Sequence, residues 1–184
     1  AGSAVGTLAA LDAGGAPLHG RLHWKHQLRP FDYYDAARLA PFRALRDRVR
    51  AYGIFGGTPR YLAAVAARRP LAESVAGAAL SPRGEVRIQV ETALDQETGL
   101  RDVAKYRAVL SAVADGRTTF NEIAQRSGLE PDTGLRVRLE RLAQLGFVEA
   151  RRNLGARRSD PWRYRLADPA FVFHYGFVAR LEAE

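Results

Sequence analysis

Between positions 149 and 165 the chain carries six arginines and only two acidic residues, Glu149 and Asp160. The arginines are Arg151, Arg152, Arg157, Arg158, Arg163 and Arg165. A guanidinium group pairs with phosphate oxygens and displaces the counterions condensed on them, so such an excess is typical of a surface that binds the nucleic-acid backbone. We expect Arg151, Arg152, Arg157 and Arg158 to contact DNA.

Two capped helices at helix-turn-helix spacing are predicted just before this arginine-rich stretch. Thr119 and Glu122 form a T-x-x-E capping box that begins the first helix, and Gly128 ends it. Asp132 or Thr133 caps the second helix. This helix is expected to pack through leucines at 3.6-residue spacing: Leu135, Leu139 and Leu142.

A hairpin and a further helix complete the unit. Apolar and polar residues alternate over 147–151 and again over 162–166, with a basic loop between them, which predicts a β-hairpin. An apolar stripe over 103–114 predicts a third helix. The segment 101–168 is therefore predicted to be a winged-helix domain, with the hairpin as its wing.

The outward side of the second helix of the pair carries Arg136, Glu140, Arg141 and Gln144. Arg136 and Arg141 are expected to contact DNA, whereas Glu140 would lie near phosphates. We therefore expect backbone binding before base-specific reading. The net charge also favours binding to the nucleic-acid backbone, since 103–166 contains 13 Lys and Arg against 7 Asp and Glu. Winged helices also serve as scaffolds for protein contacts, so a protein partner is the alternative.

Composition limits the class of protein. The chain has 184 residues, is 47% hydrophobic and contains no cysteine, so it can bury a core but has no disulfide framework or thiolate chemistry. No apolar run approaches the ~20 residues that span a bilayer, and no secretion signal is recognisable, which favours the cytoplasm. Because methionine is absent as well, we expect a fragment of a longer or processed chain.

The earlier part of the chain is predicted to be a helical bundle with short connections. Asp32 is expected to cap a short helix, and a longer helix is expected over about 41–54. Pro59 and Pro70 each begin a further helix, and a fourth is expected over 86–98. The fold class is therefore mainly α with a small β-hairpin wing.

The last segment, 169–184, permits two interpretations. Its aromatic residues alternate as in a strand, but the same run is compatible with a helix laid on the winged helix. Core packing or a dock for further sequence is expected of these residues: Phe171, Phe173, Tyr175 and Phe177.

Three histidines, His19, His23 and His26, have spacings compatible with zinc. A predicted strand would scatter them, and no cysteine or nearby carboxylate completes a tetrahedral set. We expect no metal site.

The order of motifs along the chain resembles the archaeal ATPase-like group of AAA+/STAND P-loop ATPases. The motifs are Gly2-Ser3, Pro17-Leu18-x-Gly20-Arg21, Leu28-Arg29-Pro30-Phe31, the GGTPRYL stretch from Gly56 to Leu62, and the ending Tyr164-Arg165-Leu166-Ala167-Asp168-Pro169. The resemblance covers nearly the whole chain, and its most specific element is the G-x-P motif, Gly57 to Pro59.

This resemblance implies that 1–31 is a remnant of the ATPase core edge and that 32–100 is the helical lid over the nucleotide. In the parent protein the cofactor would be ATP or ADP with Mg²⁺. The residues implied in its binding are Ser3 as a sensor polar group, Arg21 toward the γ-phosphate, and Gly57 and Pro59 on the adenine side.

The chain also departs from the family pattern, because it contains no G-x-x-x-x-G-K-[ST] loop and no acidic magnesium-binding strand. We therefore expect this chain alone not to hydrolyse ATP. Two alternatives stay open: a self-sufficient winged-helix DNA-binding transcription regulator, and a protein-interaction module.

Overall fold

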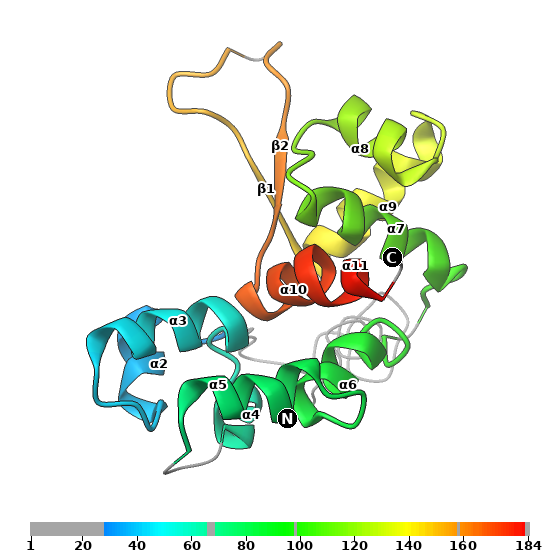
Figure 1. Ribbon diagram of the computed structural model, residues 1–184. Coiled ribbons are helices and arrows are strands. Elements are labelled where there is room, and N and C mark those ends of the chain that lie inside the picture. Colours follow the sequence, from blue (N-terminus) through cyan, green and yellow to red (C-terminus); the bar gives the residue numbers. More distant parts are fainter. Residues whose placement is uncertain (1–27, 66–68, 98, 158, 183–184) are drawn as a thin grey trace, which may run out of the picture.

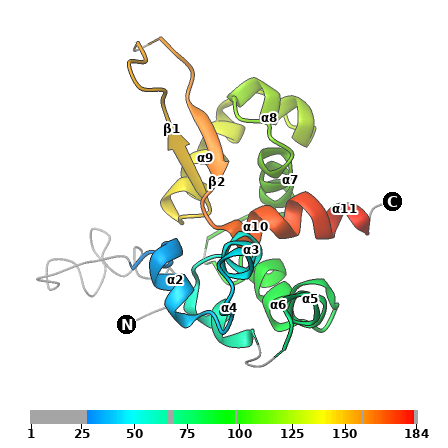
Figure 2. The same cartoon turned by 60° about the vertical axis from the view of Figure 1, so that its left-hand side comes forward.

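Helices dominate the computed structural model, which describes residues 28–65, 69–97, 99–157 and 159–182. Of the described residues 58% are helical, and the only sheet among them is small, two-stranded and antiparallel, as the sequence predicts. Figures 1 and 2 show two groups of helices, with the C-terminal helix lying between the two groups. We refer to 28–97 as the helical half and to 103–166 as the helix–hairpin unit.

The helical half contains α2 (Tyr33–Leu39), α3 (Leu45–Phe55), α4 (Pro59–Ala64), α5 (Leu71–Val75), the π-helical turn η1 (Ala76–Leu80) and α6 (Glu85–Thr92). The expected cap of α2 is confirmed, because Asp32 Oδ1 accepts hydrogen bonds from the amides of Tyr34 and Asp35. Pro59 is the first residue of α4, where its missing amide costs no hydrogen bond.

Two helix boundaries in this half were predicted wrongly. The helix expected from position 41 begins at Leu45, because residues 41–44 run non-helically and bury Phe42, whose carbonyl accepts a hydrogen bond from Arg48 Nε at 2.8 Å. The helix expected to reach position 98 ends at Thr92, and the turn that follows buries Leu94 completely. In both places the chain leaves the helix and buries an apolar side chain, although the sequence pattern alone would continue the helix.

The helix–hairpin unit follows the predictions closely. It contains α7 (Val103–Ala114), α8 (Phe120–Ser127), α9 (Thr133–Gln144), β1 (Val148–Arg151) and β2 (Arg163–Leu166). The capping box of Thr119 and Glu122 is formed, Gly128 ends α8 at φ 70°, and Asp132 Oδ1 accepts from the amide of Leu135 at 3.0 Å.

The hairpin is antiparallel, and Val148 lies opposite Leu166 at its base. Both of these side chains are buried. The strands therefore join the unit at the base of the hairpin, whereas its loop extends away from the body of the molecule (Figure 1).

The C-terminal run is helical rather than a strand. It consists of α10 (Pro169–Phe173), the π-helical turn η2 (His174–Val178) and α11 (Ala179–Leu181). It packs on α3 of the helical half and on α7 and β2 of the helix–hairpin unit. The segment thus joins the two groups of helices. Phe171 and Tyr175 are buried in the core as expected, whereas Phe177 is 60% exposed.

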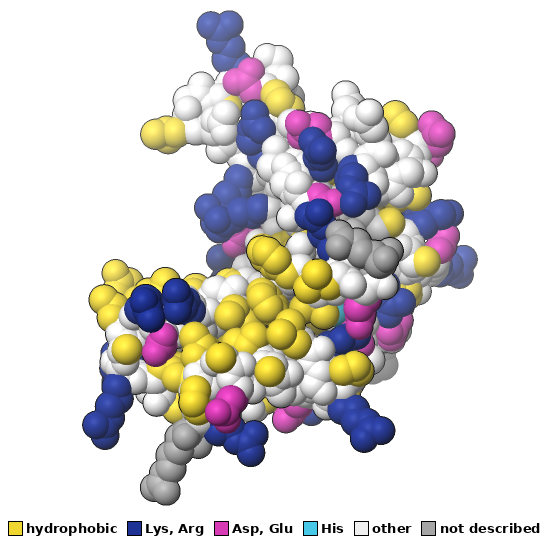
Figure 3. Space-filling model, viewed as in Figure 1, with side chains coloured by type: hydrophobic (Ala, Val, Ile, Leu, Met, Phe, Trp, Pro, Cys, Tyr) yellow, Lys and Arg dark blue, Asp and Glu magenta, His cyan; other side chains and the backbone are white. Residues whose placement is uncertain are grey.

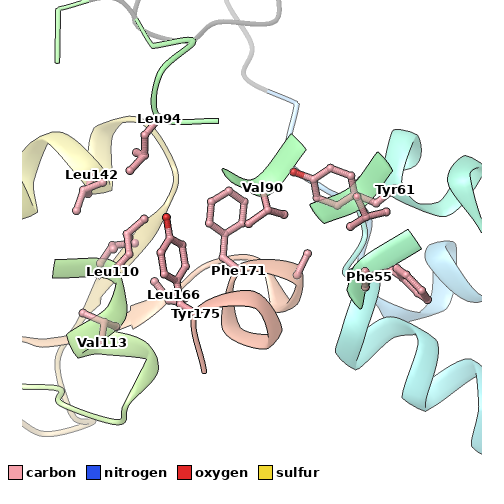
Figure 4. Close-up of a cluster of buried hydrophobic side chains, with 14 of the residues drawn as sticks. Phe55, Tyr61, Val90, Leu94, Leu110, Val113, Leu142, Leu166, Phe171 and Tyr175 are labelled. Atoms are coloured by element: carbon pink, nitrogen blue, oxygen red, sulfur yellow. The ribbon is translucent and has the colours of Figure 1, made fainter. Parts of the chain in front are cut away.

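A single cluster of buried apolar side chains runs through both halves. Figure 4 shows Phe171 and Tyr175 within this cluster, with side chains of both halves around them: Phe55, Tyr61, Val90, Leu110, Val113 and Leu142. The aromatic rings of the C-terminal helix therefore fill the space between the two groups of helices.

The surface differs between the two parts. Figure 3 shows apolar side chains gathered over the helical half and the C-terminal helix, and basic side chains more frequent around the helix–hairpin unit. Exposed apolar residues of the helical half and the C-terminal helix include Leu45, Val49, Val172 and Phe177. Within the described ranges, every helix is too short or too polar to cross a membrane.

Candidate functional site

Two motifs that lie far apart in the sequence meet where the helical half contacts the C-terminal helix. The hydroxyl of Thr58, in the GGTP loop between α3 and α4, donates a hydrogen bond of 2.9 Å to Asp168 Oδ2. The other carboxylate oxygen, Oδ1, accepts from the amide of Ala170 at 2.9 Å and so caps α10. One carboxylate therefore holds the GGTP loop and begins the C-terminal helix. We call this contact the Asp168 junction.

Both glycines of the loop lie so close to neighbouring atoms that a side chain would not fit at either position. A Cβ on Gly56 would lie 2.0 Å from Asp168 Oδ1, and a Cβ on Gly57 would lie 1.8 Å from the carbonyl oxygen of Phe31. Gly56 also has φ 67°, which side chains disfavour. The amide of Phe31 donates to the Gly57 carbonyl at 2.9 Å, so the 28–31 segment lies directly against the loop.

The junction is electrostatically unusual, because Asp168 is only 9% exposed and no cation pairs with it among the described residues. Burial raises the pKa of Asp168, and its hydrogen bonds from Ala170 and Thr58 oppose that rise. Burial also raises the pKa of Tyr61 and of Tyr52, and the nearby Asp168 charge adds to both shifts. The carboxyl group thus lies among groups that respond to its charge.

A groove of about 990 Å³ opens beside the junction, between the helical half and the base of the hairpin. Its lining includes Gly57, Thr58 and Asp168 from the junction itself. Aromatic and basic side chains supply other parts of the wall: Phe31, Tyr61, Phe147, Arg29, Arg151 and Arg165. The groove is therefore lined by polar and charged groups as much as by apolar ones, with the Asp168 carboxylate and the arginines among them.

Gly57 and Pro59, the two described residues of the predicted nucleotide set, lie on either side of Thr58. Gly57 is buried and lines the groove, whereas Pro59 is exposed and is not part of its lining. Ser3 and Arg21 lie outside the described residues, as do His19, His23 and His26. Within the described ranges, no three His, Cys, Asp or Glu side chains are grouped as metal ligands.

The predicted DNA-binding residues divide into two groups by their contacts. Arg157 is exposed, and its backbone amide rather than its guanidinium bonds to Asp160. Arg136, on α9, is exposed above the ring of Phe120 at 5.6 Å. Arg141 is half-buried, and Arg158 lies outside the described residues. Arg136 and Arg157 therefore present accessible charge.

Three arginines on or next to the strands, Arg151, Arg152 and Arg165, are engaged within the hairpin, and Arg163 donates to the Thr118 hydroxyl at 3.0 Å. Glu149 Oε2 pairs with Arg151 at 2.7 Å and with Arg165 at 2.8 Å. Arg152 lies over the ring of Trp162 at 4.9 Å and donates to the carbonyl of Asp160 at 3.0 Å. These contacts reduce the basic excess that the sequence count implies. The sequence predicts no register for the hairpin, and it is the observed pairing of Glu149 with Arg165 that brings these charges together.

Sequence reasoning singled out the GGTP loop and the Asp168-Pro169 ending separately, but it assigned no role to Thr58 or Asp168. The pairing is long-range and leaves no periodic signal. An aspartate directly before a proline, as in Asp168-Pro169, would have predicted the cap of α10, though not the contact with Thr58. Comparison of the chain with protein-family models, with curated proteins and with solved structures finds no match.

Proposed function

We propose that this chain is the helical lid and winged-helix region of a P-loop ATPase, and that it couples nucleotide state to the binding of DNA or a protein partner. The observation that carries the proposal is the Asp168 junction. It joins the two motifs on which the family resemblance depends most: the GGTP loop and the ending at Asp168-Pro169. A contact between these motifs is what a lid must have if it is to influence a winged helix.

The coupling would begin at the GGTP loop. In the parent protein, ATP or ADP with Mg²⁺ would lie against Gly57 and Pro59, with Arg21 toward the γ-phosphate and Ser3 as a sensor polar group. A shift of the loop would change the hydrogen bond from Thr58 to Asp168 and therefore the start of α10. Because α10 packs on both α3 and β2, the change would reach the hairpin. Coupling of this kind requires a ligand that binds the two arrangements unequally.

The output surface in this proposal is α9 with the hairpin loop, which together would act as recognition helix and wing. Accessible arginines at Arg136 and Arg157 suit phosphate contacts, and Glu140 is exposed on the same helix. The mixture of charges favours binding to the duplex backbone over base reading. A duplex of any sequence is therefore the expected ligand.

The test of the DNA step is fluorescence anisotropy with unrelated duplexes over a series of salt concentrations. Changing Arg157 and Arg158 together to alanine should weaken binding by a similar factor for each duplex. The salt slope should fall by roughly one to two units, about 0.9 for each phosphate that no longer pairs with an arginine. A matched control changes Arg69 and Arg83 to alanine, since both are exposed in the helical half and the change in net charge is the same.

If the two double variants weaken binding equally, then net charge alone explains duplex binding and the hairpin loop has no special role. No duplex binding by the unmodified chain would remove DNA as the partner and favour the protein-interaction module. In either case the nucleotide step remains separately testable.

The nucleotide step predicts that this chain alone neither hydrolyses ATP nor binds it tightly, because it lacks the phosphate-binding loop. Calorimetry with ATP and Mg²⁺ measures this directly. Tight binding here would contradict the proposal that the phosphate site depends on a P-loop core. The reading frame upstream of Ala1 provides an independent check: a G-x-x-x-x-G-K-[ST] loop is expected there, whereas a self-sufficient regulator would need none.

A further inference from the structure

An open hollow of about 650 Å³ is lined by α2, the link 40–43 and the start of α3. Figure 1 shows that these helices lie in the helical half, away from the hairpin loop. Three arginines and two tyrosines contribute to its lining: Arg38, Arg43, Arg48, Tyr33 and Tyr34. No carboxylate of the described residues lines it, although Asp35 and Asp47 lie close by in the sequence. The hollow therefore has the charge of an anion site, and neither the hairpin nor the groove beside Asp168 forms part of it.

The arginines of the hollow are available for an external anion. Arg38 lies in the last turn of α2, and Arg43 lies in the link before α3; both are exposed. Arg48 is held in place because its Nε donates to the Phe42 carbonyl at 2.8 Å, which leaves its terminal nitrogens as donors. None of the three forms an ion pair with a carboxylate of the described residues. Their planar donor forks suit phosphate oxygens.

Tyr34 presents an exposed aromatic ring beside these charges. Tyr34 is 78% exposed. Its ring meets that of Tyr33 edge-on at 5.5 Å, and Tyr33 meets Tyr52 in the same way at 5.8 Å. Tyr33 thus contacts rings on two sides, whereas most of Tyr34 is open to solvent. Exposed aromatic rings next to arginines are the combination that binds unpaired bases by stacking.

We propose that this hollow binds single-stranded nucleic acid, with phosphates at Arg38, Arg43 and Arg48 and a base stacked on Tyr34. A duplex fits less well, because its bases are already stacked on one another and cannot cover a tyrosine ring. An acidic peptide would use the arginines but would leave the exposed ring without a partner. This site extends the proposed function rather than resting on it, since it requires neither the hairpin arginines nor a nucleotide in the lid.

The test is anisotropy of a labelled oligothymidylate of about ten nucleotides, within the usual range of site sizes. The double variant R38A/R43A should lower affinity at least about tenfold, and should lower the salt slope by about 1.4 units, roughly 0.7 for each phosphate contact on a single strand. The control R69A/R83A removes the same charge from the same half and should have a much smaller effect. Circular dichroism and thermal unfolding of each variant check that the fold is retained.

The stacking step has its own pair of variants. Y34A should weaken binding about 5- to 100-fold, whereas Y34F keeps the ring and should bind nearly as the unmodified chain does. Equal binding by Y34A, or equal displacement of the strand by polyglutamate, would overturn the assignment to nucleic acid. Displacement by a free nucleotide at the same phosphate concentration would overturn the assignment to a strand.

The hairpin variant separates this inference from the proposed function. If changing Arg157 and Arg158 abolishes binding of the oligothymidylate while R38A/R43A leaves it unchanged, the strand binds the hairpin and the hollow is not its site. If duplex binding is absent but the strand still depends on Arg38, Arg43 and Tyr34, the hollow stands and the DNA step of the proposed function fails.

Discussion

The helix–hairpin unit and the helical half differ in what fixes their helices. In the helix–hairpin unit, α8 and α9 are begun by side chains next to them in sequence, Thr119 with Glu122 and Asp132. In the helical half, α3 to α6 begin without any hydrogen bond from a capping side chain. Thr58 shows the difference most directly. It occupies the cap position of α4, yet its hydroxyl bonds to Asp168, 110 residues away.

Asp32 also caps α2 locally, so the contrast lies between the start of α4, which depends on a tertiary contact, and the starts of α8 and α9, which depend on local ones. A substitution at the Asp168 junction should disturb two parts of the molecule together, because Asp168 also caps α10. A substitution at a cap within the helix–hairpin unit should act locally. Unfolding measurements on matched variants of the two parts can separate these cases.

The greatest loss of stability is expected from Gly56→Ala. The new Cβ would lie 2.0 Å from Asp168 Oδ1, and φ of 67° with ψ of −157° is a conformation that alanine disfavours strongly. Strain and displacement together should lower the free energy of unfolding by about 2–4 kcal/mol. Urea unfolding at neutral pH measures this.

Two glycines provide matched controls for that measurement. Gly128 has φ 70° but open space around its Cβ position, so Gly128→Ala should cost only about 1 kcal/mol of backbone strain. Gly53 lies within α3 with nothing near its Cβ position, so Gly53→Ala should be neutral or stabilise by up to about 1 kcal/mol. If Gly56→Ala costs no more than Gly128→Ala, the close approach to Asp168 does not matter to stability.

The next effect concerns Asp168 itself. Asp168→Ala removes the acceptor of two hydrogen bonds and leaves the Thr58 hydroxyl and the Ala170 amide without partners, which should cost about 1–3 kcal/mol. Asp168→Asn should cost less, because the amide oxygen can still accept from Ala170 and a hydroxyl can accept as well as donate. Equal losses for the two variants would mean that the contribution of Asp168 lies in its charge rather than in these bonds.

The same residue predicts a pH dependence. Burial raises the pKa of Asp168 in the folded chain above its ordinary value of 3.8. Between the two values the folded state binds more protons than the unfolded state, so the stability that Asp168 contributes is present at low pH and declines as pH rises through that window. The stability of Asp168→Asn relative to the unmodified chain should therefore increase from about pH 3.5 toward neutrality. Urea unfolding at a series of pH values would show a constant difference if the shift were absent.

The contrast between the two parts also explains how much the sequence could predict. The helix–hairpin unit follows local rules, so a capping box, a glycine at positive φ and an aspartate cap located α8 and α9, and strand alternation located the hairpin. In the helical half the same reasoning missed the start of α3 and the end of α6, because burial of Phe42 and Leu94 decides them.

The candidate site shows the same limit. The GGTP loop and the Asp168-Pro169 ending are visible as motifs, but no spacing rule brings positions 58 and 168 together. Likewise, counting arginines overstated the accessible charge of the hairpin, because Glu149 pairs with both Arg151 and Arg165. Local capping and pairing are readable from sequence, whereas the choice between a local and a distant partner is made by the packed structure.

The weakest effect compares two threonines that each precede a helix. Thr119→Ala removes the capping box of α8, and should cost about 1 kcal/mol, whatever residue stands at position 168. Thr58→Ala should cost a similar amount in the unmodified chain but almost nothing once Asp168 is alanine, because its hydroxyl then has no acceptor to lose. A double-mutant cycle of each threonine with Asp168 measures this coupling by urea unfolding. We expect coupling to Asp168 for Thr58 and none for Thr119. Thr58 bonds to Asp168 across the molecule, whereas Thr119 bonds within its own helix.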